Sequence, residues 1–432
     1  MQEKILHFIW KYKLFDTSNL HTADGHKVEV YKSGTHNNNT GGPDFFNAHI
    51  KIGDTHWHGN VEIHVKSSDW LVHKHQFDKA YDSVVLHVVW ETDKILYTKQ
   101  GMPMAELCLS DYVDATMLQY IRDFHQSKEH ISCKSMVKEV PHLTKKMFFD
   151  RLLVNRIQRK TNILKADYER LNKNWDHLTL LSVARVLGLL HNVEAFEQLV
   201  FSLPLDIIQK NKDNSEVIEA LVFGQAGFFQ NEYQDKYPAL LHENYLFYKV
   251  KYDLQEMDFS VWQWFRIRPA SFPSLRLAQF SSLLFHQTAF FSLVLNAMDT
   301  EDFYQLFTVP ASKYWQNHYH FDKLCKSNVH SLTKEWIDKI IINAVVPLYF
   351  LRAEIYSDFS LMEKAFRLLE KIPAEENTIV RYWLEAALPP DSAYESQALT
   401  ELYKEYCSQK KCLNCSIGYS ILKNKGTYDR EN

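Results

Sequence analysis

The sequence predicts an α+β domain over residues 1–140, followed by a larger all-α region over residues 141–432. Two observations lead to this division. In the first part, short runs of alternating apolar and polar residues end at glycine and asparagine, which is typical of strands and turns. From Thr144 onward, apolar residues recur with the period of a helix, and Val140-Pro141 lies where the pattern changes.

The first domain begins with an amphipathic helix over residues 2–15, because Ile5, Phe8 and Ile9 lie on one side of it. Five runs rich in apolar residues then predict strands at residues 28–31, 45–52, 57–66, 83–90 and 105–109. Gly53-Asp54 between the second and third strands is a hairpin signal. The fourth strand is almost entirely apolar and should be buried.

Composition is that of a globular chain, with 46% hydrophobic and 24% charged residues. A net charge of -4 gives no overall basic field, although a local basic patch stays open. The start of the chain lacks the apolar core of a secretory signal, and no stretch reaches the ~20 apolar residues of a membrane span. We expect a cytoplasmic protein without a membrane partner, and its oligomeric state is left open.

The strand at residues 57–66 carries its polar groups on one face, because Glu62, His64 and Lys66 fall on alternate positions. Asp44 immediately precedes the partner strand. Two carboxylates held close together suit Mg²⁺ or Mn²⁺. A cation there can polarise a phosphodiester and activate water, while a lysine or histidine assists proton transfer.

These residues resemble the motif of the PD-(D/E)XK nuclease superfamily. Pro43-Asp44 stands for its first element, and Glu62-Ile63-His64 stands for the second with histidine in place of lysine. The resemblance implies a mixed sheet with flanking helices, and Asp44 and Glu62 as metal ligands. It also implies that His64 takes the lysine's place, with Lys66 able to supply the missing amine.

Nearly the whole chain also resembles an uncharacterised family of bacterial proteins of about this length. The segments that carry this resemblance are "GPDFFNAHI", "GNVEIHVKSSDW", "HKHQFDKAYDSVVLHVVW", "RPASFPSLRLAQ" and "CLNCSIGYSIL". That family has no established activity, so membership implies no function.

Strand register sets a condition on the metal site. A two-residue turn at Gly53-Asp54 pairs Ile52 with Thr55, and continuing the ladder places Asp44 opposite Ile63. Asp44 would then lie on the face away from Glu62. The two carboxylates can meet only if the chain bends after Pro43 or carries a bulge, for which Gly59 is a candidate position.

The loop after this strand is rich in functional groups. His73 and His75 are candidate general acids, or ligands of a second metal together with Asp78. Asp69, Asp78 and Tyr81 are candidate substrate-binding residues. His87, inside an apolar run, is interpreted as a structural histidine.

The helical region offers two further features. Residues 144–170 carry eight Lys/Arg against three Asp/Glu, and Arg156, Arg159 and Lys160 are candidate phosphate contacts, although a solvated helix face is the preferred interpretation. Near the end of the chain, three cysteines form C-x4-C-x2-C: Cys407, Cys412 and Cys415. This spacing suits zinc or an iron–sulfur cluster, with a fourth ligand from Cys133, Cys325 or a histidine. A reduced, unligated trio is the preferred interpretation.

Three functions are consistent with these features. The first is a metal-dependent nuclease or phosphodiesterase acting on nucleic acid. The second is a binding module for nucleic acid or protein that keeps a nuclease-like fold without catalysis. The third is a metal-dependent hydrolase of a small substrate that uses His73, His75 and Asp78.

Overall fold

The computed structural model describes residues 1–37, 41–188, 191–203, 205–230, 232–326 and 331–428. The chain forms two compact units. We call the first the sheet unit, which contains Met1–Phe149, Thr378–Pro389 and Thr400–Asn432. The second, the helical unit, contains Asp150–Asn377 and Pro390–Leu399. The division therefore does not follow a single cut at residue 140, because the end of the chain returns to the sheet unit.

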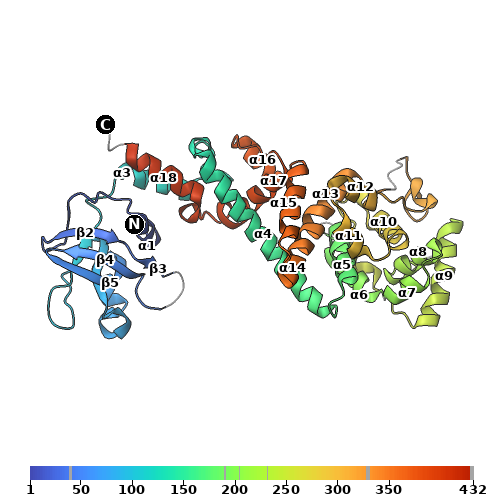
Figure 1. Cartoon of the computed structure of the whole chain (residues 1–432), viewed down its shortest axis with the longest axis horizontal. Coiled ribbons are helices and arrows are strands. Elements are labelled where there is room, and N and C mark those ends of the chain that lie inside the picture. The colour runs from blue at the N-terminus through green and yellow to red at the C-terminus, as the bar shows by residue number, and fades with distance from the viewer. Residues whose placement is uncertain (38–40, 189–190, 204, 231, 327–330, 429–432) are drawn as a thin grey trace. The chain divides into compact units, whose positions relative to one another are not determined.

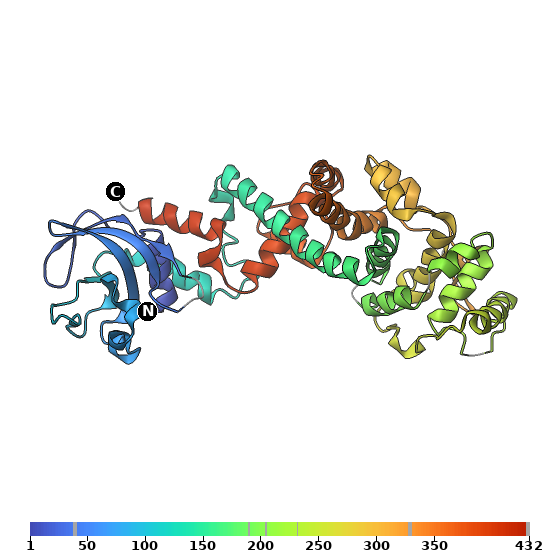
Figure 2. The same cartoon turned by 60° about the horizontal axis from the view of Figure 1, so that its bottom comes forward.

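A seven-stranded mixed sheet forms the core of the sheet unit. Its strands run in the order β1-β2-β4-β5-β6-β7, and β3 pairs with β4. Neighbouring strands from β1 to β5 are antiparallel, whereas β5-β6 and β6-β7 are parallel. The strand bounds are β1 Leu20–His21, β2 Lys27–Lys32, β3 Thr35–His36, β4 Phe45–Ile52, β5 Thr55–Lys66, β6 Val84–Glu91 and β7 Glu106–Cys108. The sheet is twisted, as Figure 2 shows.

Helix α1 (Glu3–Lys11) packs against β5 (Figure 1). Its apolar side buries Leu6, Ile9 and Trp10, and the sheet contributes Val61 and Ile63, all with no exposed surface. Burying large aliphatic and aromatic side chains on both elements stabilises this contact by roughly 1.5–3 kcal/mol for each one. The contact fixes α1 beside the strand that carries the polar face.

The predicted mixed sheet with flanking helices and the helical region after it are confirmed. The expected helix ends early, at Lys11, with Lys13 in the left-handed region at φ 50°. The hairpin turn lies at Gly53-Asp54 as expected, with Gly53 at φ 58°. The predicted buried strand is β6, where Leu86, Val88 and Val89 have no exposed surface.

Further helices complete the sheet unit. These are α2 Asp69–Val72, α3 Ala115–Gln126, α16 Thr378–Glu385 and α18 Ser416–Tyr428. Two further helices contain residues of both units: α4 His142–Arg170 and α17 Ala393–Leu402. Helices α3 and α18 lie side by side (Figure 1), although they come from distant parts of the sequence.

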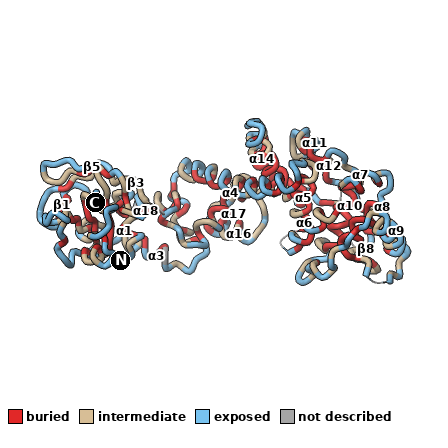
Figure 3. Tube along the Cα trace, turned by 90° about the horizontal axis from the view of Figure 1, so that it is seen from below, coloured by how far each residue is buried: buried red, intermediate tan, exposed pale blue. Residues whose placement is uncertain are grey.

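The helical unit is built from packed helices with one short hairpin. Its elements are α5 Trp175–Leu187, α6 Val193–Ser202, α7 Leu205–Lys210, α8 Ser215–Gln225, α9 Lys236–Tyr252, α10 Pro273–His286, α11 Phe290–Asn296, α12 Thr300–Phe307, β8 His318–His320, β9 Lys323–Leu324, α13 Lys334–Ile340, α14 Val346–Tyr356 and α15 Ser360–Lys371. Helix α10 is buried over nearly its whole length (Figure 3). In the described part of the chain, no helix has both the length and the apolar character needed to cross a membrane.

Candidate active site

A β-bulge in β4 brings Asp44 level with Glu62. From the turn, pairing runs regularly from Ile52 opposite Thr55 to Ala48 opposite Gly59. The next pair is Phe45 opposite Val61, so β4 holds one residue more than β5 in this interval. Continuing from that pair sets the residue before Phe45, Asp44, beside Glu62 rather than Ile63.

The extra residue of the bulge is Asn47, whose backbone is in the left-handed region with φ at 56°. Asparagine tolerates this left-handed region better than most residues. The backbone N–H of Asn47 donates to Oδ1 of Asn60 at 3.2 Å. The bulge therefore lies in β4 at Asn47 and not at Gly59. The small size of Gly59 serves another purpose, because a Cβ there would lie 2.3 Å from Cγ1 of Val85.

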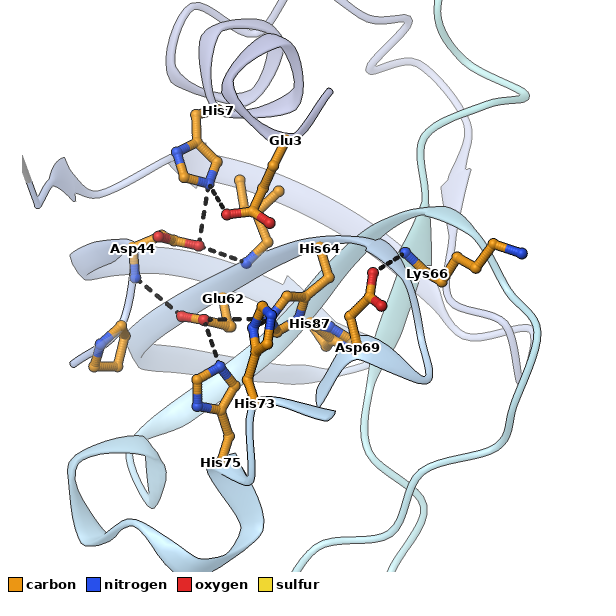
Figure 4. Close-up of polar contacts among 12 residues, drawn as sticks. Glu3, His7, Asp44, Glu62, His64, Lys66, Asp69, His73, His75 and His87 are labelled. Carbon is orange, nitrogen blue, oxygen red and sulfur yellow. Dashed lines mark hydrogen bonds and ion pairs between the residues drawn. The ribbon is translucent and has the colours of Figure 1, made fainter. Parts of the chain in front are cut away.

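Each of the two carboxylates accepts a backbone hydrogen bond from the chain segment that carries the other. The N–H of Asp44 donates to Oε2 of Glu62 at 3.1 Å, and the N–H of Ile63 donates to Oδ2 of Asp44 at 3.0 Å (Figure 4). Glu62 is only 5% exposed. Burial raises the pKa of its carboxyl group, His75 opposes the rise, and the nearby charge of Asp44 adds to it.

Three histidines gather beside Glu62. His64, His73 and His75 each offer a ligand atom, and these atoms all lie within 4.8 Å of one another. Nε2 of His64 lies 3.0 Å from Nδ1 of His73 and 3.7 Å from Oε1 of Glu62. Nε2 of His75 lies 3.2 Å from the same Glu62 oxygen. Figure 4 shows Glu62 between Asp44 and this group of rings.

A turn after β5 directs both loop histidines to the strand. Helix α2 begins at Asp69, and Lys74 then reverses the chain with φ at 63°. Trp70 is buried and packs edge-on against His75, with ring centroids 5.3 Å apart. On the other side, the Tyr81 ring stacks on His75 at 3.8 Å. These rings hold His75 in a mostly apolar slot with its Nε2 toward Glu62.

A buried chain of hydrogen bonds behind the site fixes the tautomer of His64. Glu62, His87 and Glu106 are register partners across β5, β6 and β7. Oε2 of Glu106 lies 3.0 Å from Nδ1 of His87, and Nε2 of His87 lies 2.8 Å from Nδ1 of His64. Ser67 donates to the other Glu106 oxygen at 2.7 Å.

The direction of this chain follows from its carboxylate end. An ionised Glu106 only accepts, so His87 donates from Nδ1 and has an accepting Nε2 in its neutral form. His64 must then donate from Nδ1, which leaves a lone pair on its Nε2, the atom that faces Glu62 and His73. Burial first, then His87, His75 and His73, lower the pKa of His64 to about 2. His64 is therefore a neutral imidazole with its lone pair in the site.

Helix α1 adds a histidine to the other side of Asp44. Nε2 of His7 lies 3.2 Å from Oδ2 of Asp44 and 3.7 Å from Oε1 of Glu3. Burial opposes charge on His7, but Asp44 and Glu3 outweigh it and raise the pKa of the imidazole. His7 therefore favours its charged form next to the Asp44 carboxylate.

Several sequence-predicted residues lie outside this group. Lys66 does not supply an amine to the site: its Nζ lies 3.4 Å from Oε1 of Glu91, its neighbour on β6, and points away from the carboxylates (Figure 4). Asp69 accepts from the Lys66 N–H at 2.9 Å and closes the turn after β5. Asp78 caps the next short helix by accepting from the N–H of Ala80 at 2.9 Å. Asp78 is thus not the carboxylate that accompanies His73 and His75, and Glu62 takes that position.

The predicted phosphate contacts lie on the part of α4 that belongs to the helical unit. Nε of Arg156 donates to Oε1 of Gln397 at 2.6 Å, and Nζ of Lys160 donates to Oδ1 of Asn343 at 2.7 Å. Arg159 is exposed and also has an interaction partner. Two of these side chains thus join α4 to other helices of the same unit.

Sequence reasoning missed three residues of the site. Glu106 is a charged residue within a short apolar run, and this was the only feature of the sequence that could have indicated a role for it. His7 follows Glu3 by four positions on α1, a spacing that places both on one helix face. His87 was interpreted as structural, and it is indeed buried and hydrogen-bonded, but its partner is a histidine of the site.

The donors of the site fit a divalent metal ion. Nε2 of His75 is buried and has no hydrogen-bond partner, although Oε1 of Glu62 is 3.2 Å away. A nitrogen and a carboxylate oxygen this close together can bind the same metal ion. Imidazole nitrogens suit Zn²⁺ and related ions, while carboxylates also suit Mn²⁺. The nitrogen-rich set differs from the all-oxygen site expected for Mg²⁺.

Comparison with known proteins gives one positive result. No curated protein and no solved structure matches the chain. A family described as protein of unknown function (DUF2851) matches residues 3–378, which is most of the chain. The protein belongs to this DUF2851 family.

Proposed function

We propose that this protein is a metal-dependent phosphodiesterase that cleaves nucleic acid with a PD-(D/E)XK-like domain. The observation that carries the proposal is the bulge at Asn47, which aligns Asp44 with Glu62. Simple alternation would separate these carboxylates. A bulge that reorients a side chain next to a cluster of polar groups is typical of functional sites.

The order of elements supports the same assignment. A helix carrying Glu3 and His7 precedes a hairpin with Asp44 at its start and Glu62 on its second strand. A buried strand then runs parallel to that second strand. These elements agree with the mixed sheet and flanking helices that the resemblance implied, with histidine in place of lysine at position 64.

Asp44, Glu62, His64 and His75 would hold the metal, and Mn²⁺ or Zn²⁺ fits these donors better than Mg²⁺. When bound, such an ion polarises a phosphodiester and lowers the pKa of water. His64 contributes a neutral lone pair and not a positive charge, so it does not replace the lysine of the motif as a cation. It acts as a ligand whose orientation is set by His87 and Glu106.

The remaining groups suit proton transfer and substrate contact. His73 is exposed at the rim and lies 3.0 Å from His64, so it can exchange protons with solvent. Burial, then Glu62 and Asp44, raise the pKa of Tyr81 to about 12, which keeps its hydroxyl protonated at neutral pH. A protonated phenol beside the carboxylates can donate to a phosphate oxygen or to a leaving group.

The test is cleavage by the full-length protein. Labelled single- and double-stranded DNA and RNA are incubated with the protein and Mn²⁺, Zn²⁺ or Mg²⁺. We expect cleavage with Mn²⁺ or Zn²⁺, and a loss of about 10²-fold or more in Glu62→Gln. Glu29→Gln, on β2, is the matched control and should retain full activity. Equal activity of wild type and Glu62→Gln would overturn the assignment.

A small phosphodiester is the second candidate substrate. The observation that favours it is the three-histidine group, which departs from the two-carboxylate and lysine pattern. Hydrolysis of bis(p-nitrophenyl) phosphate without cleavage of any nucleic acid would support this alternative. Tight nucleic-acid binding with neither activity would instead indicate a binding module.

A further inference from the structure

Two distant segments of the sheet unit meet around four cysteines. Residues 407–415 fold against residues 129–133, and Lys410 joins them. Its Nζ donates to the carbonyl of Glu129 at 2.9 Å and contacts Oγ of Ser132 at 3.1 Å. Ser132 also lies near the thiol of Cys412, whose pKa burial raises and Ser132 lowers. Cys133 follows directly, so the fold brings it to the C-terminal cysteines.

The C-terminal cysteines lie on a tightly folded turn. Cys407 ends one helical turn (Tyr403–Cys407), and Lys410 reverses the chain with φ at 52°. The N–H of Cys415 donates to the carbonyl of Cys412 at 3.2 Å. At Gly418 a Cβ would lie 2.2 Å from that carbonyl oxygen, so only glycine lets the turn pack on the start of α18.

The four thiols are reduced and shielded from water. Cys133, Cys407 and Cys415 are 8%, 9% and 7% exposed, and Cys412 is partly buried. All four are free cysteines. Burial, followed by the charges of neighbouring cysteines, raises the pKa of Cys133 and of Cys407. Cys412 and Cys415 lie on one hydrogen-bonded turn, and the contact between Lys410 and Ser132 brings Cys133 to that turn.

We propose that Cys133, Cys407, Cys412 and Cys415 form a closed four-thiolate metal centre. Its occupant is a thiophilic metal, either one zinc ion or an iron–sulfur cluster. Cys412-x2-Cys415 has the spacing of a chelating turn, and Cys133 provides the fourth ligand that the sequence left open. A metal cation offsets the repulsion between buried thiolates, and Lys410 supplies a further positive charge beside Cys407 and Cys412.

Four protein ligands leave no open position for a substrate, so this centre is structural. It would join the C-terminal turn to the segment around Ser132. Ser132 precedes Lys410, its partner in the turn, by 278 positions in the sequence. Metal binding of this kind contributes directly to folding stability. The C-terminal turn and α18 should therefore depend on the metal.

The experiment measures zinc and iron in full-length protein purified without chelator, with an anaerobic preparation in parallel. We expect about one zinc per chain, or two to four irons with visible absorption. Cys133→Ser and Cys412→Ser should lose this metal. Cys108→Ser is the matched control, because its thiol bonds Ser110 and the Trp90 carbonyl instead. His75→Ala should retain it, which separates this centre from the candidate active site.

A second measurement needs no variant. Adding Co²⁺ to metal-depleted wild type should produce thiolate-to-cobalt charge-transfer bands, which nitrogen and oxygen ligands do not give. Zinc and iron both well below one per chain, together with no such bands, would overturn the proposal. Zinc and iron contents of Cys133→Ser equal to those of wild type would also overturn it, because the fourth ligand would then be another residue.

Discussion

Replacing His64 by glutamine should change how stability depends on pH. In the folded protein, burial and four nearby histidines hold the pKa of His64 at about 2. In the unfolded chain its pKa is near the ordinary value of about 6.5. Between these values the unfolded state binds a proton that the folded state does not. The stability that neutral His64 contributes is therefore complete above about pH 6.5 and is lost as the pH falls.

The size of the effect follows from the two pKa values. At pH 5.0, the unfolded side chain is almost fully protonated, which favours unfolding by about 1.4 kcal/mol for each pH unit below 6.5. The free energy of unfolding should thus fall by about 2 kcal/mol between pH 7.5 and pH 5.0 because of this one group. Almost no solvent reaches His64, since its side chain is 1% exposed, so screening does not reduce the value.

The assay is urea denaturation of wild type and His64→Gln at pH 7.5, 6.5, 5.5 and 5.0, followed by tryptophan fluorescence and circular dichroism. The difference between the two proteins should shrink by about 2 kcal/mol from the highest to the lowest pH. Val65→Ala, next along β5 and without a titrating group, controls for loss of packing and should keep the wild-type pH dependence. A difference that stays constant with pH would refute the buried, neutral state of His64.

Three further predictions test other parts of the site. Glu106→Gln should weaken binding of Mn²⁺ or Zn²⁺ by about 10- to 100-fold in calorimetric titrations, because it weakens the hydrogen bonds that orient His64. The control variant Glu91→Gln should bind these ions as wild type does. Equal metal affinities of Glu106→Gln and wild type would show that Glu106 does not support the site. At pH 7.5 without added metal, the free energy of unfolding of Glu62→Gln should be at least equal to that of wild type, because burial raises the pKa of this carboxyl group and disfavours its charge. A clear loss of stability in the variant would contradict this. Because Asn47 has φ at 56°, Asn47→Val should lower the free energy of unfolding by about 1–2 kcal/mol more than Asn47→Gly does in urea denaturation. Equal losses of stability in the two variants would place the bulge elsewhere.

Local sequence patterns predicted five of the seven strands of the sheet and the register next to the hairpin turn, but not β1, β3 or the register beyond the bulge. The strand at residues 45–52 and the turn at Gly53-Asp54 follow from alternation and turn chemistry. The bulge could be stated only as a condition for Asp44 to meet Glu62. Its position depends on Asn47 adopting a left-handed conformation, which many asparagines can adopt and few do.

Residues brought together by distant parts of the chain were harder to predict. Glu106 joins the site through parallel pairing of β7 with β6, and no local pattern specifies that pairing. Lys66 satisfied the alternation of β5 but faces Glu91, because strand neighbours of opposite charge attract. Cys133 was one of several possible fourth ligands, and only the return of the chain end to the sheet unit favours it.

The proposed active site is tested most directly by the rate of metal-dependent nucleic-acid cleavage by Asp44→Asn compared with wild type. Asp44 is the residue that simple alternation would place on the other face of the sheet, so its participation depends on the bulge. We expect Asp44→Asn to leave the fold unchanged, as measured by circular dichroism, and to lower the cleavage rate by about 10²-fold or more. Cleavage by the folded variant at the wild-type rate would contradict the proposed site.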